Sequence, residues 1–60
     1  MQYHTLLVYY NNQWFIEFGD YDYKTVIEER QCSYADEKCK IITTTDDQAS
    51  IDKAVANLNK

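Results

Sequence analysis

Three kinds of side chain in this sequence could do chemistry: one histidine, two cysteines and a pair of closely spaced aspartates. His4 could activate a thiol only if Cys32 or Cys39 lay beside it, and no local spacing brings them together. The cysteines are seven residues apart with no second pair, whereas a zinc knuckle spaces each pair by about two to four residues. We therefore expect a structural histidine, two small packed thiols and no metal site.

Asp20 and Asp22 match the Asp-x-Asp start of a calcium-binding loop, but the rest of that loop is missing. Its sixth position is not Gly, and its twelfth is Gln31 rather than Glu. The single glycine excludes a Gly-rich phosphate loop, and the adjacent Glu28 and Glu29 point apart on a helix. A polar turn with Asp22 capping a helix is the simpler interpretation. We expect no enzymatic activity and no cofactor.

Length, composition and charge restrict the class of protein. Sixty residues make one small domain spanning 1–60, and 45% hydrophobic with 15% aromatic residues indicates a folded chain. The net charge is −4, and the excess lies in residues 1–30, which hold two basic and five acidic side chains. Without a basic patch to replace counterions, direct binding to DNA or RNA is not expected.

The sequence also bears on location. No apolar run approaches the roughly 18 residues of a membrane span, and the first residues lack the basic and apolar regions of a signal peptide. We therefore expect a cytoplasmic protein that does not bind membranes. In that compartment Cys32 and Cys39 are reduced thiols; in a secreted protein they would form one bridge closing a short loop.

The first eighteen residues predict a β-hairpin. Residues 2–10 and 13–18 have strand compositions, and Asn11-Asn12 between them suits a two-residue type I′ turn. The implied register places Tyr10 opposite Gln13, and continues to Thr5 opposite Phe18. One sheet face then carries Tyr3, Leu7, Tyr9, Trp14, Ile16 and Phe18, and the other carries His4, Leu6, Val8, Tyr10, Phe15 and Glu17.

The remaining chain predicts a helix, a strand and a second helix. Residues 23–36 would be apolar on neither side as a strand, but as a helix they form one stripe of Tyr23, Val26, Ile27, Arg30 and Tyr34. Residues 38–45 are β-branched, and Thr45-Asp46-Asp47-Gln48 then matches a capping box before a last amphipathic helix. The expected fold is α+β, in the order β-β-α-β-α. Its three-stranded antiparallel sheet has strand order 2-1-3, with both helices on one face.

If both helices cover one face, the other face of the hairpin is left uncovered. That face carries Leu6, Val8, Tyr10 and Phe15, and an acidic edge of Glu17, Asp20, Tyr21 and Asp22 lies beside it. An uncovered apolar sheet face usually marks a partner site, and Tyr and Trp bind well at protein interfaces. The simplest partner is a second copy, packed sheet against sheet as a homodimer.

Residues Trp14–Asp22, together with Asp47–Asp52, resemble small accessory proteins encoded by bacteriophages and prophages. The resemblance covers most of the chain and carries over no site residues. It implies the cytoplasm of a bacterial host cell and a regulator or inhibitor directed at a larger protein.

Three functions follow as hypotheses. The first is a non-enzymatic protein-binding module of this accessory type. The alternative is an acidic decoy that blocks the nucleic-acid channel of a DNA- or RNA-handling enzyme. Its phosphate mimics would be Glu17, Asp20, Asp22, Glu28, Glu29, Asp36 and Glu37. The third is a small enzyme or metal protein whose site a partner completes.

Overall fold

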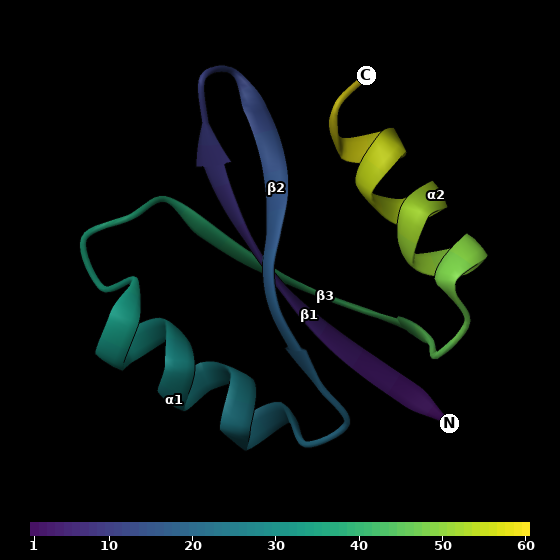
Figure 1. Cartoon of the computed structure of the whole chain (residues 1–60), viewed down its shortest axis with the longest axis horizontal. Coiled ribbons are helices and arrows are strands. Elements are labelled where there is room, and N and C mark those ends of the chain that lie inside the picture. Colours follow the sequence, from purple (N-terminus) through teal and green to yellow (C-terminus); the bar gives the residue numbers. More distant parts are fainter.

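The computed structural model describes all residues, 1–60. It contains three strands and two helices joined by turns (Figure 1). Their order is β1 (Gln2–Tyr10), β2 (Gln13–Asp20), α1 (Tyr23–Ser33), β3 (Cys39–Thr45) and α2 (Gln48–Leu58). Both β2 and β3 pair antiparallel with β1, which gives the sheet order β2-β1-β3. The predicted α+β fold, its β-β-α-β-α order and its strand order are confirmed.

The hairpin forms where the sequence predicts it. Asn11 and Asn12 both have positive φ, at 54° and 66°, as a type I′ turn requires. The predicted pairing holds from Tyr10 opposite Gln13 as far as Leu7 opposite Ile16. It then shifts by one residue, because Glu17 forms a bulge and Phe18 pairs with Leu6 rather than with Thr5. The predicted Thr5–Phe18 pair is therefore wrong, and Phe18 lies on the opposite face from the one expected.

The two helices cover opposite faces of the sheet, so the prediction that both lie on one face is wrong. In Figure 1, α1 lies on one side of the crossing strands and α2 on the other. The neighbouring residues Leu6 and Leu7 point to opposite faces of β1, yet both are 0% exposed. A strand that is buried on both sides needs a covering layer on each, which α1 and α2 provide.

The segment that could be read as helix or strand is a helix. Asp22 is the N-cap of α1, and its carboxylate accepts hydrogen bonds from the Lys24 backbone and the Thr25 hydroxyl. Val26 is the fully buried residue of this helix. The helix ends at Ser33, three residues before the predicted end, with Tyr34 as its C-cap.

The last helix begins with a different cap from the one predicted. Asp47 is the N-cap of α2 and accepts a hydrogen bond from the Ser50 backbone at 2.9 Å. Thr45, expected in that role, is still in β3, and its hydroxyl donates to the Asp47 carboxylate. Ile51 is the buried residue of α2 and packs over the face opposite α1.

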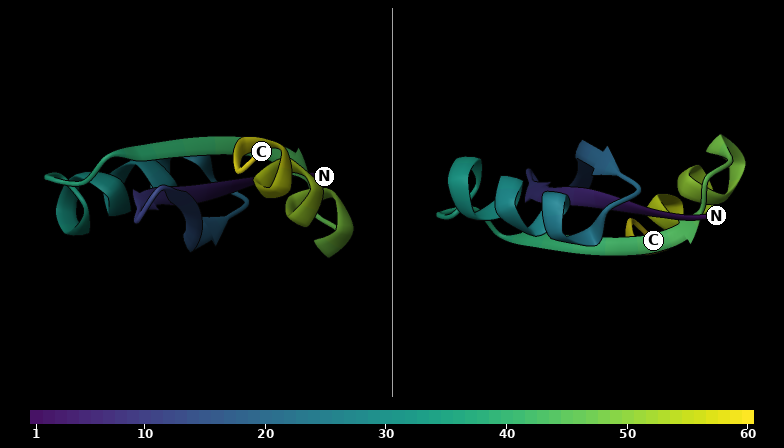
Figure 2. Two further views of the ribbon diagram at one scale, coloured as in Figure 1. Left: turned by 90° about the horizontal axis from the view of Figure 1, so that it is seen from above. Right: turned by 90° about the horizontal axis from the view of Figure 1, so that it is seen from below.

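The molecule is thin across the strands. Its Cα atoms extend over 29 × 27 × 10 Å, and three strands about 4.8 Å apart account for the short dimension. Figure 2, which shows the molecule of Figure 1 from above and from below, has β3 along one outer margin with no element outside it. The two edges of the sheet are β2 and β3. Neither helix is long and apolar enough to cross a membrane.

Candidate functional site

The largest hollow on the surface lies between the tip of the hairpin and the C-terminal end of α1. It has a volume of about 540 Å³ and is open to solvent. The hairpin and the segment after α1 contribute its lining: Val8, Tyr10, Phe15, Ile16, Glu17, Tyr34 and Glu37. We call this hollow the groove.

The groove exists because α1 is shorter than the hairpin it covers. The helix buries Leu6 and Val8 beneath it but ends at Ser33, before it reaches the hairpin tip. There Tyr10 remains 70% exposed and Phe15 43% exposed, although both belong to the same sheet face as Val8. A small domain that leaves two aromatic side chains exposed beside each other presents an apolar patch of the kind found at interfaces.

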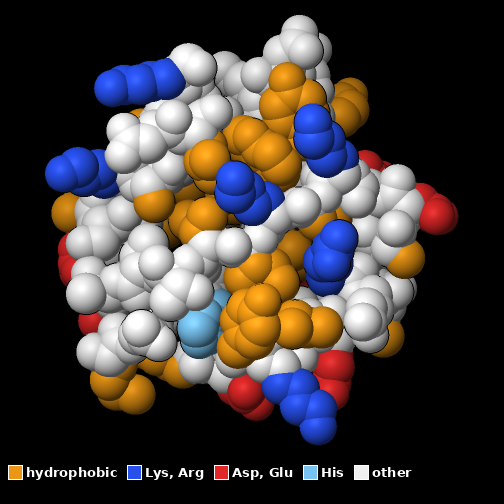
Figure 3. Space-filling model, turned by 180° about the vertical axis from the view of Figure 1, so that it is seen from behind, with side chains coloured by type: hydrophobic (Ala, Val, Ile, Leu, Met, Phe, Trp, Pro, Cys, Tyr) orange, Lys and Arg blue, Asp and Glu red, His pale blue; other side chains and the backbone are white.

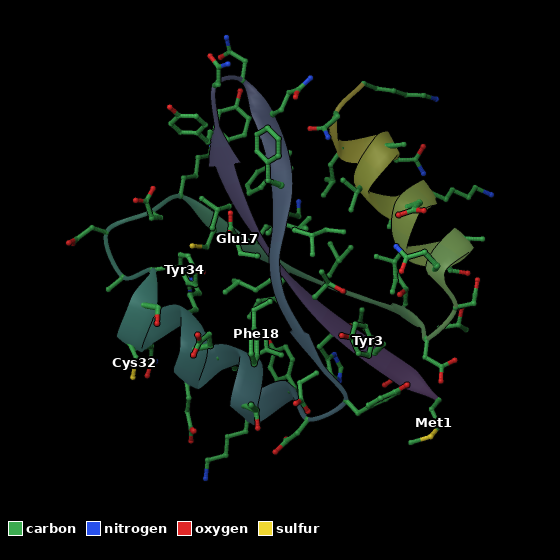
Figure 4. All side chains as sticks on the ribbon, in the orientation of Figure 1. Met1, Tyr3, Glu17, Phe18, Cys32 and Tyr34 are labelled. Atoms are coloured by element: carbon green, nitrogen blue, oxygen red, sulfur yellow. The ribbon has the colours of Figure 1, made fainter.

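One hydrogen bond joins the two walls of the groove. The Tyr34 hydroxyl donates to a carboxylate oxygen of Glu17 at 3.5 Å, and Figure 4 shows these two labelled side chains lying close together on the α1 side of the sheet. Partial burial and the negative charge of Glu17 raise the pKa of Tyr34 above its usual value. Tyr34 is therefore a neutral hydroxyl near pH 7. Its carbonyl oxygen accepts a hydrogen bond from the Cys39 thiol at 3.5 Å, which anchors this segment to β3.

The groove is apolar inside and negative at its rim. Five of its seven lining residues are hydrophobic, and the other two are the carboxylates Glu17 and Glu37. No basic side chain lines it. This combination favours a ligand that presents an apolar side chain with a positive charge next to it.

The sequence-predicted binding surface is divided by the fold. Val8, Tyr10, Phe15 and Glu17 come together in the groove. Leu6 lies on the same face but is fully buried under α1, so it cannot contact a partner. The idea of a whole uncovered sheet face is wrong, because α1 covers all of it except the hairpin tip.

The other three predicted residues lie at the far end of β2, away from the groove, and shape the turn into α1. Asp20 accepts a hydrogen bond from the backbone N–H of Asp22 at 2.8 Å, and Asp22 caps α1. Tyr21 packs edge-to-face on Tyr3 and donates to Asp46 at 3.2 Å. The negative charge of Asp46 and this hydrogen bond raise the pKa of Tyr21. These side chains have structural partners within the chain.

Three groove residues were not anticipated from the sequence: Ile16, Tyr34 and Glu37. Ile16 lies opposite Leu7, on the face predicted for it, but it is 47% exposed next to the bulge at Glu17 and lines the groove as well. The sequence predicts Tyr34 in the buried stripe of the helix, whereas it is the C-cap and forms a wall of the groove. The available signal was the acidic stretch after it, Asp36 and Glu37, which is unfavourable in the last turn of a helix.

Among the side chains that could take part in catalysis or metal binding, His4 and Cys39 make structural contacts. His4 Nδ1 lies 2.9 Å from the Thr43 hydroxyl, and the His4 ring packs edge-to-face on Tyr23. Both cysteines are free thiols; Cys32 is exposed, and Cys39 is partly buried. No three His, Cys, Asp or Glu side chains gather where they could hold a metal ion.

A second, smaller hollow of about 120 Å³ lies on the α2 side of the sheet, between Tyr3, Gly19 and Ile51. The hydroxyl of Thr5, which is 1% exposed, has no hydrogen-bond partner in the chain there. A hollow of this size admits water but not a ligand of several rings.

Comparison of the chain with models of protein families, with curated proteins and with solved structures finds no match.

Proposed function

We propose that this chain is a small protein-binding module without enzymatic activity, and that it binds a larger protein through the groove. The observation that carries the proposal is the exposed pair Tyr10 and Phe15 in a 540 Å³ apolar hollow with carboxylates at its rim. Aromatic side chains supply large contact areas at little cost in conformational entropy, so they dominate binding energies at interfaces.

The chemistry of the groove suggests what it binds. A partner segment with one large apolar side chain would fill the space between Phe15 and Tyr34. A Lys or Arg next to that side chain would lie near Glu17 and Glu37, which gives charge complementarity. We propose an apolar segment with a basic neighbour on a larger protein as the ligand.

The biological setting is part of the same proposal. The resemblance to phage and prophage accessory proteins favours a regulator or inhibitor that acts in the cytoplasm of a bacterial host cell. A module of this size acts by occupying a surface of its target rather than by chemistry of its own.

Affinity capture from a bacterial lysate tests the proposal when two matched variants are run beside the native chain. Phe15→Glu places a charge in the groove, and Gln13→Glu places the same charge on the same strand outside it. We expect Phe15→Glu to weaken capture of the partner by at least about tenfold and Gln13→Glu to leave it unchanged. Equal capture by all three chains would overturn the groove as the binding site.

A charge-reversing pair tests the rim. Glu37 lines the groove, while Glu28 is exposed on α1 and does not. Glu37→Lys should weaken capture, and Glu28→Lys, which changes the net charge equally, should not. If both variants weaken capture equally, and if salt and added nucleic acid abolish it, the acidic-decoy hypothesis is favoured instead.

A further inference from the structure

The edge strand β3 has an unpaired side. Because β1 lies between β2 and β3, only one side of β3 is hydrogen-bonded within the sheet. In both views of Figure 2, β3 runs along an outer margin of the molecule with neither helix covering it. An edge strand of seven residues presents a row of free backbone N–H and C=O groups to the surroundings.

The hydrogen-bonding pattern shows which residues present those groups. The backbone N–H of Tyr9 donates to the carbonyl oxygen of Lys38 at 2.8 Å, so Lys38 faces β1. Alternate residues of an antiparallel strand turn their backbone groups to the same side, so Lys40, Ile42 and Thr44 face β1 as well. The outward groups then belong to Cys39, Ile41, Thr43 and Thr45.

The opposite edge of the sheet, at β2, is blocked in two ways. The Asn59 side chain pairs with both the N–H and the C=O of Trp14, at 2.7 and 3.2 Å. The bulge at Glu17 then interrupts the strand and places a charge beside it. Bulges, charges and covering groups are the usual devices that prevent an edge from pairing. Along β3 the pairing register has no shift. Lys40 is its one charged residue, and the only side-chain bond to an outward group is at its last residue, where the Thr44 hydroxyl donates to the Thr45 carbonyl at 2.7 Å.

We propose that β3 pairs antiparallel with β3 of a second copy, which joins two three-stranded sheets into one continuous sheet. Because the β2 edge is blocked, each copy offers one open edge, and the assembly closes as a two-fold dimer instead of growing into a filament. This interface is separate from the groove and leaves it free for a partner.

A register centred on Ile42 suits this pairing. It sets Ile41 opposite Thr43 of the second copy, and Cys39 opposite Thr45, so that residues with outward backbone groups form the hydrogen-bonded pairs. Ile42 then meets Ile42 of the second copy at the two-fold axis. Ile41 and Ile42 are each partly exposed at the edge, and the pairing would cover them.

The charges at the ends of β3 are complementary in the same register. Lys38 lies opposite Asp46 of the second copy, and by symmetry this pair occurs twice. Both residues are exposed, and the Lys38 ammonium lies 4.6 Å from the centre of the Tyr9 ring, which holds it beside the end of the strand. Lys40 lies opposite Thr44, so no two like charges are directly opposite each other across the paired strands. Figure 3, seen from behind, shows apolar side chains between several Lys and Arg side chains, with Asp and Glu only toward the margin of that face.

The oligomeric state of the purified chain tests the proposal, measured by sedimentation equilibrium up to roughly 100 µM. We expect a monomer–dimer equilibrium with no larger species. In a chemically synthesised chain, methylation of the Thr43 backbone nitrogen removes one outward hydrogen-bond donor and leaves every side chain in place. This chain should be monomeric, with an unchanged far-ultraviolet circular dichroism spectrum.

Charge reversal tests the register. Lys38→Glu should weaken the dimer about tenfold, since it affects two symmetric pairs, whereas Lys53→Glu on the exposed face of α2 should not. The double variant Lys38→Glu with Asp46→Lys should restore the native affinity. A chain that is monomeric throughout would overturn the proposal. So would a dimer that survives Thr43 N-methylation or is abolished by Phe15→Glu, which would place the interface elsewhere. These results are independent of the capture experiment, so either proposal can fail alone.

Discussion

The side-chain amide of Asn59 hydrogen-bonds both backbone groups of Trp14. Its carbonyl oxygen accepts from the Trp14 N–H at 2.7 Å, and its amide group donates to the Trp14 carbonyl at 3.2 Å. An amide side chain offers the same donor and acceptor as a peptide group of a neighbouring strand. Asn59, the C-cap of α2, thus makes the two hydrogen bonds that a residue of a neighbouring strand would make with Trp14. These bonds connect the last helix to the hairpin.

Replacing Asn59 by Ala should destabilise the fold and expose the β2 edge. The loss of two exposed hydrogen bonds should lower the free energy of unfolding by about 1 kcal/mol and the Tm by about 4–8 °C. Hydrogen exchange, followed by NMR, should become faster at the Trp14 amide. Asn57→Ala is the matched control, because Asn57 is exposed on α2 and makes no side-chain hydrogen bond. Equal effects of the two substitutions would contradict the bridging role of Asn59.

Gly19 should not tolerate a side chain while Tyr3 lies next to it. A Cβ atom at Gly19 would lie 2.7 and 2.8 Å from two ring atoms of Tyr3, closer than van der Waals contact allows. Gly19→Ala should therefore lower the free energy of unfolding by about 1–3 kcal/mol, measured by urea denaturation.

The double variant Tyr3→Ala with Gly19→Ala tests whether the ring of Tyr3 causes the loss of stability in Gly19→Ala. If the ring of Tyr3 is the obstacle, Gly19→Ala should cost much less in the Tyr3→Ala background than in the native chain. An equal cost in both backgrounds would show that the backbone, and not the ring, requires glycine.

The elements and strand order could be predicted because each has a local cause in the sequence. The Asn11-Asn12 turn sets the hairpin, Asp22 caps α1, and the β-branched run before Asp46 makes a strand. These signals depend on residues within a few positions of each other, and tertiary packing did not override them.

The bulge and the placement of the helices could not be predicted with the same rules. The bulge at Glu17 has no local signature in the sequence. Of the hairpin residues predicted to lie in the core, Phe18 is the one that the bulge moves to the opposite face. The side on which α2 packs depends on contacts distant in sequence. One signal was present: Leu6, Leu7 and Val8 form a continuous apolar run, which is typical of a strand buried on both faces.

Only the hairpin side of the groove could be predicted from the sequence, because its other side depends on tertiary packing. Tyr10 and Phe15 follow from the hairpin register, so the sequence predicts that they share a surface. Tyr34 and Glu37 form the other wall, and their position depends on where α1 ends. The end of a helix without a Gly or Pro stop signal is set by packing, which a single sequence does not show.

The two thiols should react at different rates in the native protein. Cys32 is exposed, whereas Cys39 is partly buried and donates a hydrogen bond to the Tyr34 carbonyl. A thiol reagent with a coloured product should show one fast and one slow phase of equal amplitude without denaturant. Cys32→Ser should remove the fast phase only. A single phase for the native chain would contradict this difference in exposure.

Asp47 should make stability depend on pH below about 4. The hydroxyl of Thr45, followed by the hydroxyl and backbone N–H of Ser50, lowers the pKa of Asp47 from 3.8 to about 2. Because the folded pKa lies below the unfolded one, the ionised carboxylate stabilises the fold above pH 4, and this contribution is lost as the pH falls from 4 to 2. Asp47→Asn keeps a side-chain acceptor at the helix start but cannot ionise.

Melting curves of the native chain and Asp47→Asn, followed by circular dichroism from pH 5 to pH 2, measure this contribution. We expect the native chain to have the higher Tm at pH 5, and the difference to shrink toward pH 2. All other carboxylates are the same in the two chains, so the difference between the two curves isolates Asp47. Asp36→Asn, which removes an exposed carboxylate from the loop after α1, is the control for the loss of one negative charge. A constant difference between the native chain and Asp47→Asn over this range would show that the charge of Asp47 does not stabilise the start of α2, and that its hydrogen bonds suffice without it.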